Sequence, residues 1–276
     1  MKKLILLLAT VSVLTFGCAS PDTSSAPKHR KVAVQAYSYN RFTAEETINK
    51  IKDMGLDGIE LYPNQRLSNK YPGVKVNYTM NAEQRAYLKK LLADANLKAV
   101  SFGVTHTKND AEVEKVCEFA KDMGIKTVLT EDPVIRFAAW EKFGKKYGVK
   151  MAVHHHTFSS SNQYFDPEVL CKFVKGHDNV KSNPDVGHWA RCGIDPVKAL
   201  HTLRGTIGSV HFKDQKEFGN HESQPVPFGE GAMDVKGMLE ELDSQGYDGF
   251  YVIEYEAEWD NPTPSILKCV KYLRNN

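Results

Sequence analysis

Eight short apolar runs alternate with eight longer amphipathic runs between residues 31 and 276, and this alternation constrains the fold more than any other feature. The short runs have the length of buried strands, and the longer runs have the apolar spacing of helices that pack by one face. Links of about two residues from a helix to the next strand force each strand to lie parallel to its predecessor. The predicted strands cover residues 31–37, 56–62, 97–104, 125–131, 149–155, 179–185, 207–213 and 250–256.

A helical pattern follows each predicted strand. Thr43 and Glu46 have the spacing of a capping box, and Gly55 is placed to end the same helix. Eight such units in a chain of this length predict an α/β fold, a (β/α)₈ TIM barrel in a single domain. The rival is an open doubly wound sheet, which usually has a glycine-rich phosphate loop after its first strand, and QAYSYN has no glycine. The predicted helices cover residues 43–55, 82–96, 110–124, 137–148, 166–176, 195–205, 234–246 and 264–275.

The N-terminus has the pattern of an export signal. Two lysines precede an apolar run of 13 residues (4–16), which is too short to span a bilayer. The run leads to Cys18 in the manner of a lipobox, although Leu14 lies one place too far from it. We expect a signal peptide over 1–17 and a lipidated, Ser/Pro-rich tether over 18–30 that begins at Cys18, in a periplasmic or outer-membrane-anchored lipoprotein. A plain secreted protein cleaved nearby is the alternative.

Charge and cysteine spacing narrow the classes of function. The formal net charge is +2, and it falls to zero without the two lysines of the signal. The body has no lysine- or arginine-rich run, which argues against nucleic acid as a partner. Zinc–thiolate sites use closely spaced cysteine pairs, so we expect buried thiols rather than such a site. The cysteines of the body are Cys117, Cys171, Cys192 and Cys269, none of them in CxxC spacing.

Polar side chains gather where the predicted strands end. In a TIM barrel the carboxyl ends of the strands meet at one rim, where the chemistry is done. Strand interiors such as 32–34 are apolar, so surface charge scattered along the chain does not explain the pattern. Seven of the eight predicted strand ends bring acids or histidines to this rim: Glu60, His106, Glu131, Asp132, His154, His155, His156, Asp185, His188, His211, Lys213, Asp214, Glu254 and Glu256.

Asp185, His211 and Glu254 together predict a metal site. A single aspartate or histidine at a strand end is more often a loop cap or a satisfied core residue. A carboxylate, an imidazole and a second carboxylate from neighbouring strands, with a further donor from the fourth or fifth strand, suit one divalent ion: Mn²⁺, Zn²⁺, Co²⁺ or Mg²⁺. Carboxylates this close would repel one another without a cation. Such an ion can hold two vicinal oxygens of a sugar and acidify the C–H beside a carbonyl.

Six segments occur in a recognisable order: DGIELYP, GVKMAVHHHT, PDVGHW, VHFKD, PFGEGAMD and VIEYE. Together they resemble the xylose-isomerase-like TIM-barrel superfamily, which contains sugar isomerases, epimerases, inosose dehydratases and type IV endonucleases. The resemblance covers about residues 31–276. It implies that Asp185, His211 and Glu254 are metal ligands and that His188 contacts a substrate oxygen. It also implies that Glu230 is an acid of the loop after the seventh strand, and that Lys213 and Asp214 order the end of that strand.

The end of the fifth predicted strand departs from the epimerase pattern. Many epimerases of the superfamily have a glutamate there that binds metal and moves a proton. Here the position is His154, in an HHH run nearer to the inosose-dehydratase-like branch. Glu131, at the end of the fourth strand, could restore a carboxylate. We expect His154 or His156 to take the metal or an acid–base role, and the third imidazole of the run to turn into the wall.

These observations lead to the hypothesis of an exported, metal-dependent sugar isomerase or epimerase that works through an enediolate. Glu254, Glu131 or His154 would take the α-proton. Loss of a β-leaving group would instead make a dehydratase or lyase for keto-sugars or 3-keto-glycosides. A non-catalytic carbohydrate-binding lipoprotein is a third reading, and an abasic-site endonuclease would need a basic DNA groove that the charge does not provide. We expect a small sugar or glycoside as partner, membrane contact only through the lipid anchor, and leave homo-oligomerisation open. The substrate-binding candidates are His156, His188, Lys213, Glu230, Glu60 and His106.

Overall fold

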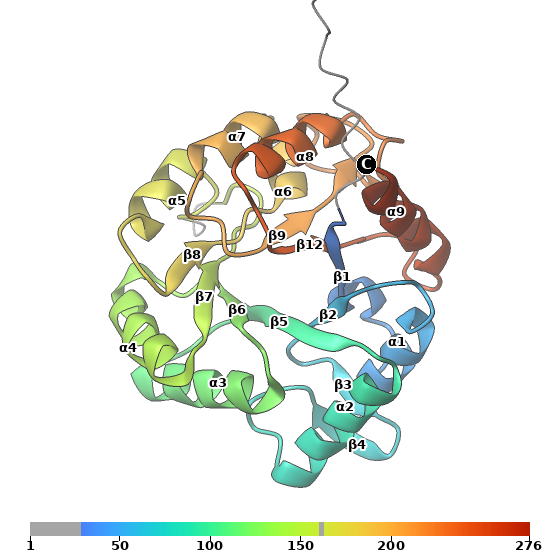
Figure 1. Cartoon of the computed structure of the whole chain (residues 1–276), viewed down its shortest axis with the longest axis vertical. Coiled ribbons are helices and arrows are strands. Elements are labelled where there is room, and N and C mark those ends of the chain that lie inside the picture. The colour runs from blue at the N-terminus through green and yellow to red at the C-terminus, as the bar shows by residue number, and fades with distance from the viewer. Residues whose placement is uncertain (1–28, 160–162) are drawn as a thin grey trace, which may run out of the picture.

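A single sheet of eight parallel strands forms the centre of the protein, in a computed structural model that describes residues 29–159 and 163–276. Figure 1 shows the strands curled into a ring with the helices outside it. The strand order is β8-β7-β6-β5-β2-β1-β12-β9. The predicted TIM barrel is confirmed, with all eight strands at the expected places: β1 (Lys31–Gln35), β2 (Gly58–Leu61), β5 (Lys98–Thr105), β6 (Thr127–Thr130), β7 (Lys150–Val153), β8 (Val180–Ser182), β9 (Val210–Phe212) and β12 (Phe250–Ile253).

The ring closes at a seam between β8 and β9. Two parallel bridges, Ser182 with Ile207 and Asp185 with His211, join the two edges of the sheet. The backbone N–H of His211 also donates to the carbonyl of Pro184 over 3.0 Å. The seam therefore places Asp185 and His211 beside each other at the carboxyl end of the barrel, the rim that we call the mouth.

Helices cover the outside of the barrel. Thr43 and Glu46 form the predicted capping box, whereas the helix that they begin ends before Gly55. Gly124 and Gly148 end two other helices in the left-handed conformation, which glycine adopts without steric cost. Of the nine helices in the described residues, only the short α6 was not predicted. The helices are α1 (Ala44–Ile51), α2 (Ala82–Asp94), α3 (Asp110–Met123), α4 (Phe137–Tyr147), α5 (Pro167–Val174), α6 (Val186–Arg191), α7 (Pro196–Thr202), α8 (Val235–Ser244) and α9 (Thr263–Asn275).

Short insertions follow four strands at the mouth. Two antiparallel hairpins were not predicted: β3 (Arg66–Ser68) with β4 (Tyr71–Lys75), and β10 (Asp214–Gln215) with β11 (Pro225–Val226). Their strands have two to five residues, which is too short for a periodic pattern. Two single turns of 3₁₀ helix complete the elements, η1 (Ala36–Tyr39) and η2 (Val134–Arg136).

Strand residues alternate between two buried environments. Val32 and Val34 of β1 join the apolar core between sheet and helices. Gln35 faces the other way, into the barrel, where its side chain contacts Glu60. Because the side chains of a strand alternate between its two faces, every second residue of the ring points inward. The residues just past each strand carry this inward direction to the mouth.

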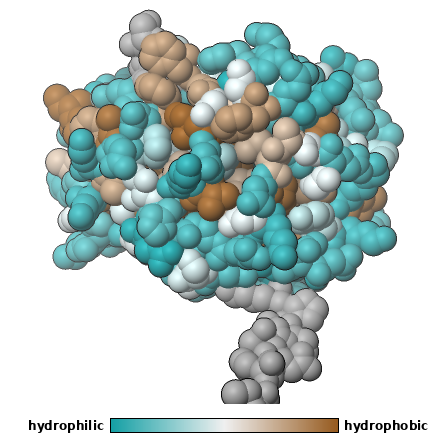
Figure 2. Space-filling view, turned by 90° about the horizontal axis from the view of Figure 1, so that it is seen from above, coloured by the Kyte–Doolittle hydropathy of each residue, from teal (hydrophilic) through white to brown (hydrophobic). Residues whose placement is uncertain are grey.

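One face of the molecule shows how polar and apolar side chains are distributed on the surface. Figure 2 shows a face on which hydrophilic side chains predominate and hydrophobic ones form patches between them. In the part of the chain that the structure describes, no helix has the length and apolarity needed to cross a membrane. The predicted signal peptide, Cys18 and most of the tether lie outside the described residues.

Candidate metal centre and active site

Asp185, His211, Lys213 and Glu254, with His154 beside His211, meet at the mouth in one buried group, here called the seam cluster. Nδ1 of His211 lies 2.9 Å from Oε2 of Glu254 and 3.6 Å from Oδ2 of Asp185. Asp185 was predicted to end a strand. In the structure it caps α6 instead, and its Oδ1 accepts the backbone N–H of His188. The structure thus brings together the three side chains that the sequence selected as metal ligands.

Lys213 supplies the positive charge of the seam cluster. It comes two residues after His211, so both side chains point into the barrel. Its Nζ lies 2.9 Å from Oδ2 of Asp185, 2.8 Å from Oε2 of Glu254 and 2.9 Å from Oε2 of Glu256. Gly187 makes room for it, because a Cβ there would lie 2.6 Å from Cδ of Lys213. With 1% of its surface exposed, Lys213 is an internal counterion, a different position from the substrate contact expected of it.

Glu60 holds His211 from below. Its Oε1 lies 2.7 Å from Nε2 of His211, and Gln35 and Ser101 donate hydrogen bonds to its two oxygens. Glu60 is fully buried beneath the imidazole, so it supports His211 instead of facing the open mouth as a substrate contact would. A carboxylate on one ring nitrogen orients the other, and here it turns Nδ1 toward Asp185.

Opposite charges in contact overcome the cost of burial within the seam cluster. Burial opposes the charge on Asp185, yet His188 and Lys213 beside it hold its pKa well below the ordinary value. We regard Lys213 as the main cation, because burial lowers the pKa of His188 itself. Burial likewise opposes the charge on Glu254, but Lys213 and His211 lower its pKa. The carboxylates around Lys213 and His211 raise the pKa of both cations against the effect of burial.

The donor atoms of the seam cluster fit a divalent ion. Oδ2 of Asp185 and Nδ1 of His211 are buried and make no hydrogen bond of good geometry with any described residue. One donor atom each from His154, Asp185 and His211 lies within 4.8 Å of the others. Nδ1 of His154 lies 2.8 Å from Oδ1 of Asn183, which leaves Nε2 as its other ring nitrogen. Glu254 adds a carboxylate next to His211, so nitrogen and oxygen donors of the type that Mn²⁺, Zn²⁺ and Co²⁺ accept are present.

The three consecutive histidines after β7 have different environments. His154 points into the barrel and is buried. His155 turns into the wall, as predicted for one of the three: its ring stacks on Trp189 at 4.6 Å, and Nε2 accepts the backbone N–H of Asp185. Burial lowers the pKa of His155 to about 4, so it is neutral. His156 lies half exposed at the rim, with Nδ1 2.7 Å from Oε1 of Glu131.

The remaining predicted site residues lie outside the seam cluster, and two of them have structural hydrogen bonds. Glu230 is exposed and pairs with Lys268 of α9 over 2.9 Å. His106 is exposed and lines a cavity of about 190 Å³ that none of the seam cluster lines. Asp214 accepts the backbone N–H groups of the glycines at 229 and 231, so it holds the loop that carries Glu230. Asp132 is buried, where it accepts hydrogen bonds from Thr107 and Trp140.

Sequence reasoning missed the polar residues that support the ligands. Gln35 and Ser101 contact Glu60, and Asn183 contacts His154. Their positions in the sequence could have indicated this role. Gln35 and Ser101 lie within predicted strands, and a polar side chain that points into a barrel needs a hydrogen-bond partner. Tyr37 and Tyr62, after β1 and β2, also meet at the mouth, with ring centroids 4.9 Å apart.

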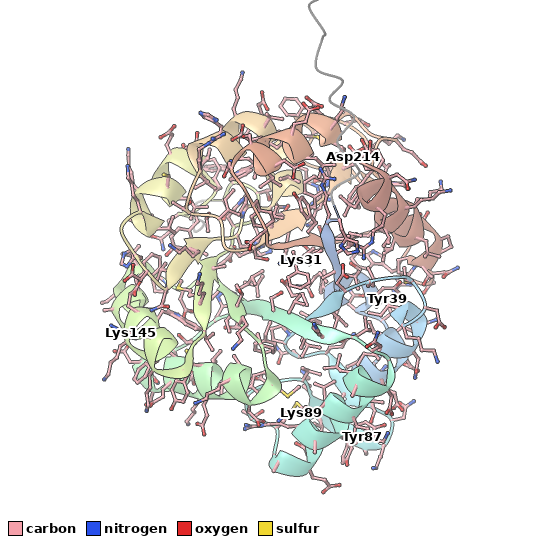
Figure 3. The ribbon with its side chains drawn as sticks, viewed as in Figure 1. Lys31, Tyr39, Tyr87, Lys89, Lys145 and Asp214 are labelled. Carbon is pink, nitrogen blue, oxygen red and sulfur yellow. The ribbon has the colours of Figure 1, made fainter. Side chains whose placement is uncertain are left out.

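The opposite end of the barrel also has a cavity, of about 550 Å³. Residues at or just before the starts of several strands line it, including Lys31, Lys98 and Lys126. Figure 3 shows Lys31 near the middle of the ring and Lys145 on the outside of α4. The lining has no histidine and only one carboxylate, Asp248, so the metal-ligating groups belong to the mouth.

Comparison with known proteins identifies what the chain is similar to. Residues 48–276 match the family described as "Xylose isomerase-like TIM barrel". An inosose dehydratase of Lacticaseibacillus casei is 25% identical over 174 residues, which are 54% of this chain and 58% of that enzyme. This match therefore spans less than two thirds of the dehydratase. An L-ribulose-5-phosphate 3-epimerase of Shigella flexneri is 24% identical over 271 residues, 83% of this chain and 88% of the epimerase. Among solved structures, an uncharacterised protein of Parabacteroides distasonis is 27% identical with a TM-score of 0.73, covering 89% of this chain and 98% of that one.

Proposed function

This chain belongs to the xylose isomerase-like TIM barrel family, and from that premise we propose that it is a divalent-metal-dependent enzyme that isomerises or epimerises a carbohydrate or cyclitol. The observation that carries the proposal is the meeting of His154, Asp185 and His211 at the mouth, with Glu254 in contact with His211. The similarity to an L-ribulose-5-phosphate 3-epimerase and to an inosose dehydratase supports a sugar-like substrate.

His154, Asp185, His211 and Glu254 would hold the ion. A divalent ion bound there would supply a Lewis acid for a substrate carbonyl and its neighbouring hydroxyl. The protein's own contribution is to keep these donors in place. Glu60 orients His211, and burial of the whole group excludes water that would weaken its charges.

We assign the proton transfer to His156, with Glu131 as its partner. Burial works against a charge on His156, but the contact with Glu131 outweighs it and raises the pKa of the imidazole. An imidazole that is oriented by a carboxylate can act as a general base toward a proton beside a carbonyl. Glu254 is a weaker candidate, because its lowered pKa makes it a poor base. His156 would take the α-proton and return it to the neighbouring carbon, which gives isomerisation; epimerisation would need a second proton donor on the opposite face of the substrate.

Exchange of that proton with solvent tests the proposal. In D₂O, a panel of ketoses and keto-glycosides is incubated with the protein, and NMR follows deuterium incorporation at the α-carbon. Chelation should stop the exchange and Mn²⁺ should restore it. Asp185→Asn should slow it by about 10³-fold or more, because several kcal/mol of charge stabilisation is lost. Full activity of protein shown by elemental analysis to hold no metal would sink the proposal.

A dehydratase or lyase is the second candidate, favoured by two observations. The fifth-strand end carries a histidine where many epimerases have a glutamate, and an inosose dehydratase is among the relatives. The same α-proton removal would then be followed by loss of the β-substituent. Mass spectrometry separates the two reactions, since isomerisation conserves the mass of the substrate and elimination does not. Sugar binding without either reaction would support the non-catalytic lipoprotein instead.

We further propose that the protein is exported and anchored by a lipid on Cys18, as its N-terminal pattern predicts. Metabolic labelling with palmitate tests this: the native protein should carry label in the membrane fraction, and Cys18→Ser should not. An unlabelled native protein would leave secretion without an anchor as the better account.

A further inference from the structure

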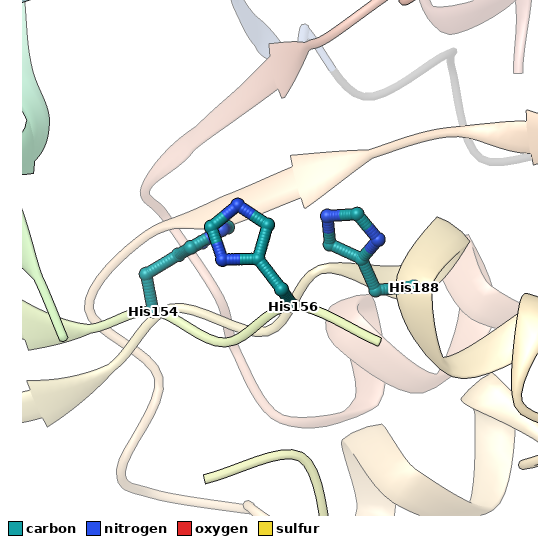
Figure 4. A group of neighbouring side chains, drawn as sticks. All are labelled: His154, His156 and His188. Carbon is teal, nitrogen blue, oxygen red and sulfur yellow. The ribbon is translucent and has the colours of Figure 1, made fainter. Parts of the chain in front are cut away.

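A second group of metal donors stands beside the first. His154, His156 and His188, here called the histidine cluster, come from two elements, the end of β7 and the helix α6 (Figure 4). One ring nitrogen of each lies within 4.8 Å of the others. The ring of His156 lies 4.8 Å from that of His154 and 4.9 Å from that of His188, between centroids.

The surroundings prepare these rings as ligands. Metal-bound histidines usually hold a proton on one nitrogen through a carboxylate, amide or carbonyl oxygen, which puts the lone pair on the other. His154 has Asn183 at Nδ1, and His156 has Glu131 at Nδ1. His188 is 6% exposed, and its Nδ1 has no hydrogen-bond partner within residues 29–159 and 163–276. A buried ring nitrogen without a partner is costly unless something binds it.

We propose that the histidine cluster is a second metal site, built only of imidazoles, that binds a late first-row ion such as Zn²⁺, Ni²⁺ or Co²⁺. Imidazole suits these ions, whereas Mg²⁺ and Mn²⁺ favour carboxylate, carbonyl and water oxygens. Three histidines are a known zinc ligand set that leaves one position open. The claim concerns binding, so it does not depend on the reaction proposed above.

Both sites need His154, so they cannot each hold an ion at the same time. It belongs to both groups of donors, but Nδ1 is engaged by Asn183, so it has one nitrogen to give. An ion in the histidine cluster therefore takes a ligand from the seam cluster. The same ion would also bind the ring of His156. A late transition ion in excess should therefore inhibit any reaction in which His156 takes part.

The rings need only a modest movement to close on an ion. Tetrahedral Zn²⁺ with its usual bond lengths holds nitrogens about 3.3 Å apart. The three ring nitrogens, which now lie within 4.8 Å of one another, must therefore come closer together. His156 can supply the movement, because it lies half exposed after the end of β7, while His154 and His188 are buried.

Calorimetric titration of the chelator-treated protein with Zn²⁺, and separately with Mn²⁺, tests the proposal. His156→Ala removes a ligand of the histidine cluster alone, His211→Ala a ligand of the seam cluster alone, and His154→Ala one from both. We expect His156→Ala to weaken Zn²⁺ by at least tenfold and Mn²⁺ by less than twofold, and His211→Ala to do the reverse. His221→Ala, on an exposed loop, measures adventitious binding.

The outcomes are distinct. Co²⁺ should give the intense visible absorption of a tetrahedral nitrogen site in the native protein and in His211→Ala, but not in His156→Ala or His188→Asn. Thermal melts check that each variant is folded, and His188→Asn replaces His156→Ala if the latter is not. Zn²⁺ affinity unchanged in both of these variants would overturn the site. Tight binding of two ions at once would overturn its exclusivity.

Discussion

The seam cluster and the histidine cluster lie at the same mouth and compete for His154, yet they offer an ion different surroundings. Asp185, His211 and Glu254 are buried, and Lys213 already neutralises the carboxylates. The histidine cluster contains no carboxylate and no ammonium group, and Glu131 raises the pKa of its half-exposed member His156 against the effect of burial. An ion entering the seam cluster must share its carboxylates with an ammonium group, whereas an ion entering the histidine cluster meets nitrogen lone pairs. Four substitutions test this difference.

Removal of the internal ammonium should have the largest effect. Lys213→Met leaves Asp185, Glu254 and Glu256 without their cation, and breaking a buried ion pair in this way costs about 3–5 kcal/mol of the free energy of unfolding. Chemical denaturation measures the loss. Saturating Mn²⁺ should restore part of it, because the ion replaces the missing charge in the native state.

Lys145→Met is the matched control, since this lysine is exposed on the outside of α4 (Figure 3). It should change the free energy of unfolding by less than about 0.5 kcal/mol. A Lys213→Met protein as stable as this control would mean that the carboxylates of the seam cluster are not charged together.

Loss of the Glu60 carboxylate that supports His211 should have the second largest effect. Glu60→Gln keeps the shape of the side chain but removes the charge that faces Nε2 of His211. Loss of such a partner usually weakens a metal site by about 10–100-fold. Mn²⁺ affinity should fall accordingly, whereas Zn²⁺ affinity at the histidine cluster should stay within twofold. Equal losses for both ions, measured by the same titrations, would show that the two sites are not separate.

These substitutions rest on features that the sequence predicted unevenly. The barrel was predictable because most strands are short apolar runs, and most of the predicted helices end a few residues before the next predicted strand. The convergence of Asp185 and His211 was also predictable, since strand ends meet at one rim and consecutive strands are neighbours. Period-two alternation places His211 with Lys213, and Glu254 with Glu256, on one inward face.

The partners of these residues were not predictable. Whether Glu60 reaches the substrate or His211 depends on how far β2 is staggered against β9 across the barrel, and no sequence spacing encodes that offset. Lys213 reads as a solvated or substrate-binding cation until Gly187 is seen to leave space for it. α6 has only six residues, too few for a periodic signal, so the position of His188 beside His156 could not be derived.

Asn183 tests the one residue that the clusters share. Asn183→Ala removes the oxygen at Nδ1 of His154, so the imidazole loses the partner that fixes its tautomer and orientation. Both Mn²⁺ and Zn²⁺ should bind more weakly, by about tenfold each, at the lower end of the usual effect of such partners. Loss for one ion only would assign His154 to a single cluster.

The pair of His156 and Glu131 at the rim should have the smallest effect. Burial disfavours a charge on His156, but Glu131 outweighs it, so folding raises the pKa of this histidine above the ordinary 6.5. The pair therefore adds stability below pH 6.5, and that contribution is lost as the pH rises through the folded pKa. Because His156 is half exposed, solvent screens the pair and the stability change is small.

NMR titration of the histidine ring protons, assigned with His156→Ala, measures this pKa directly. Glu131→Gln should lower it, because the amide cannot balance the imidazolium. The same substitution should weaken Zn²⁺ binding at the histidine cluster by about tenfold, because the amide no longer supports His156 as a ligand, while Mn²⁺ binding at the seam cluster is unaffected. A His156 pKa that does not change in Glu131→Gln would mean that Glu131 has no electrostatic effect on the ring, and the protonation of His156 would then have to be set by the carboxylates of the seam cluster.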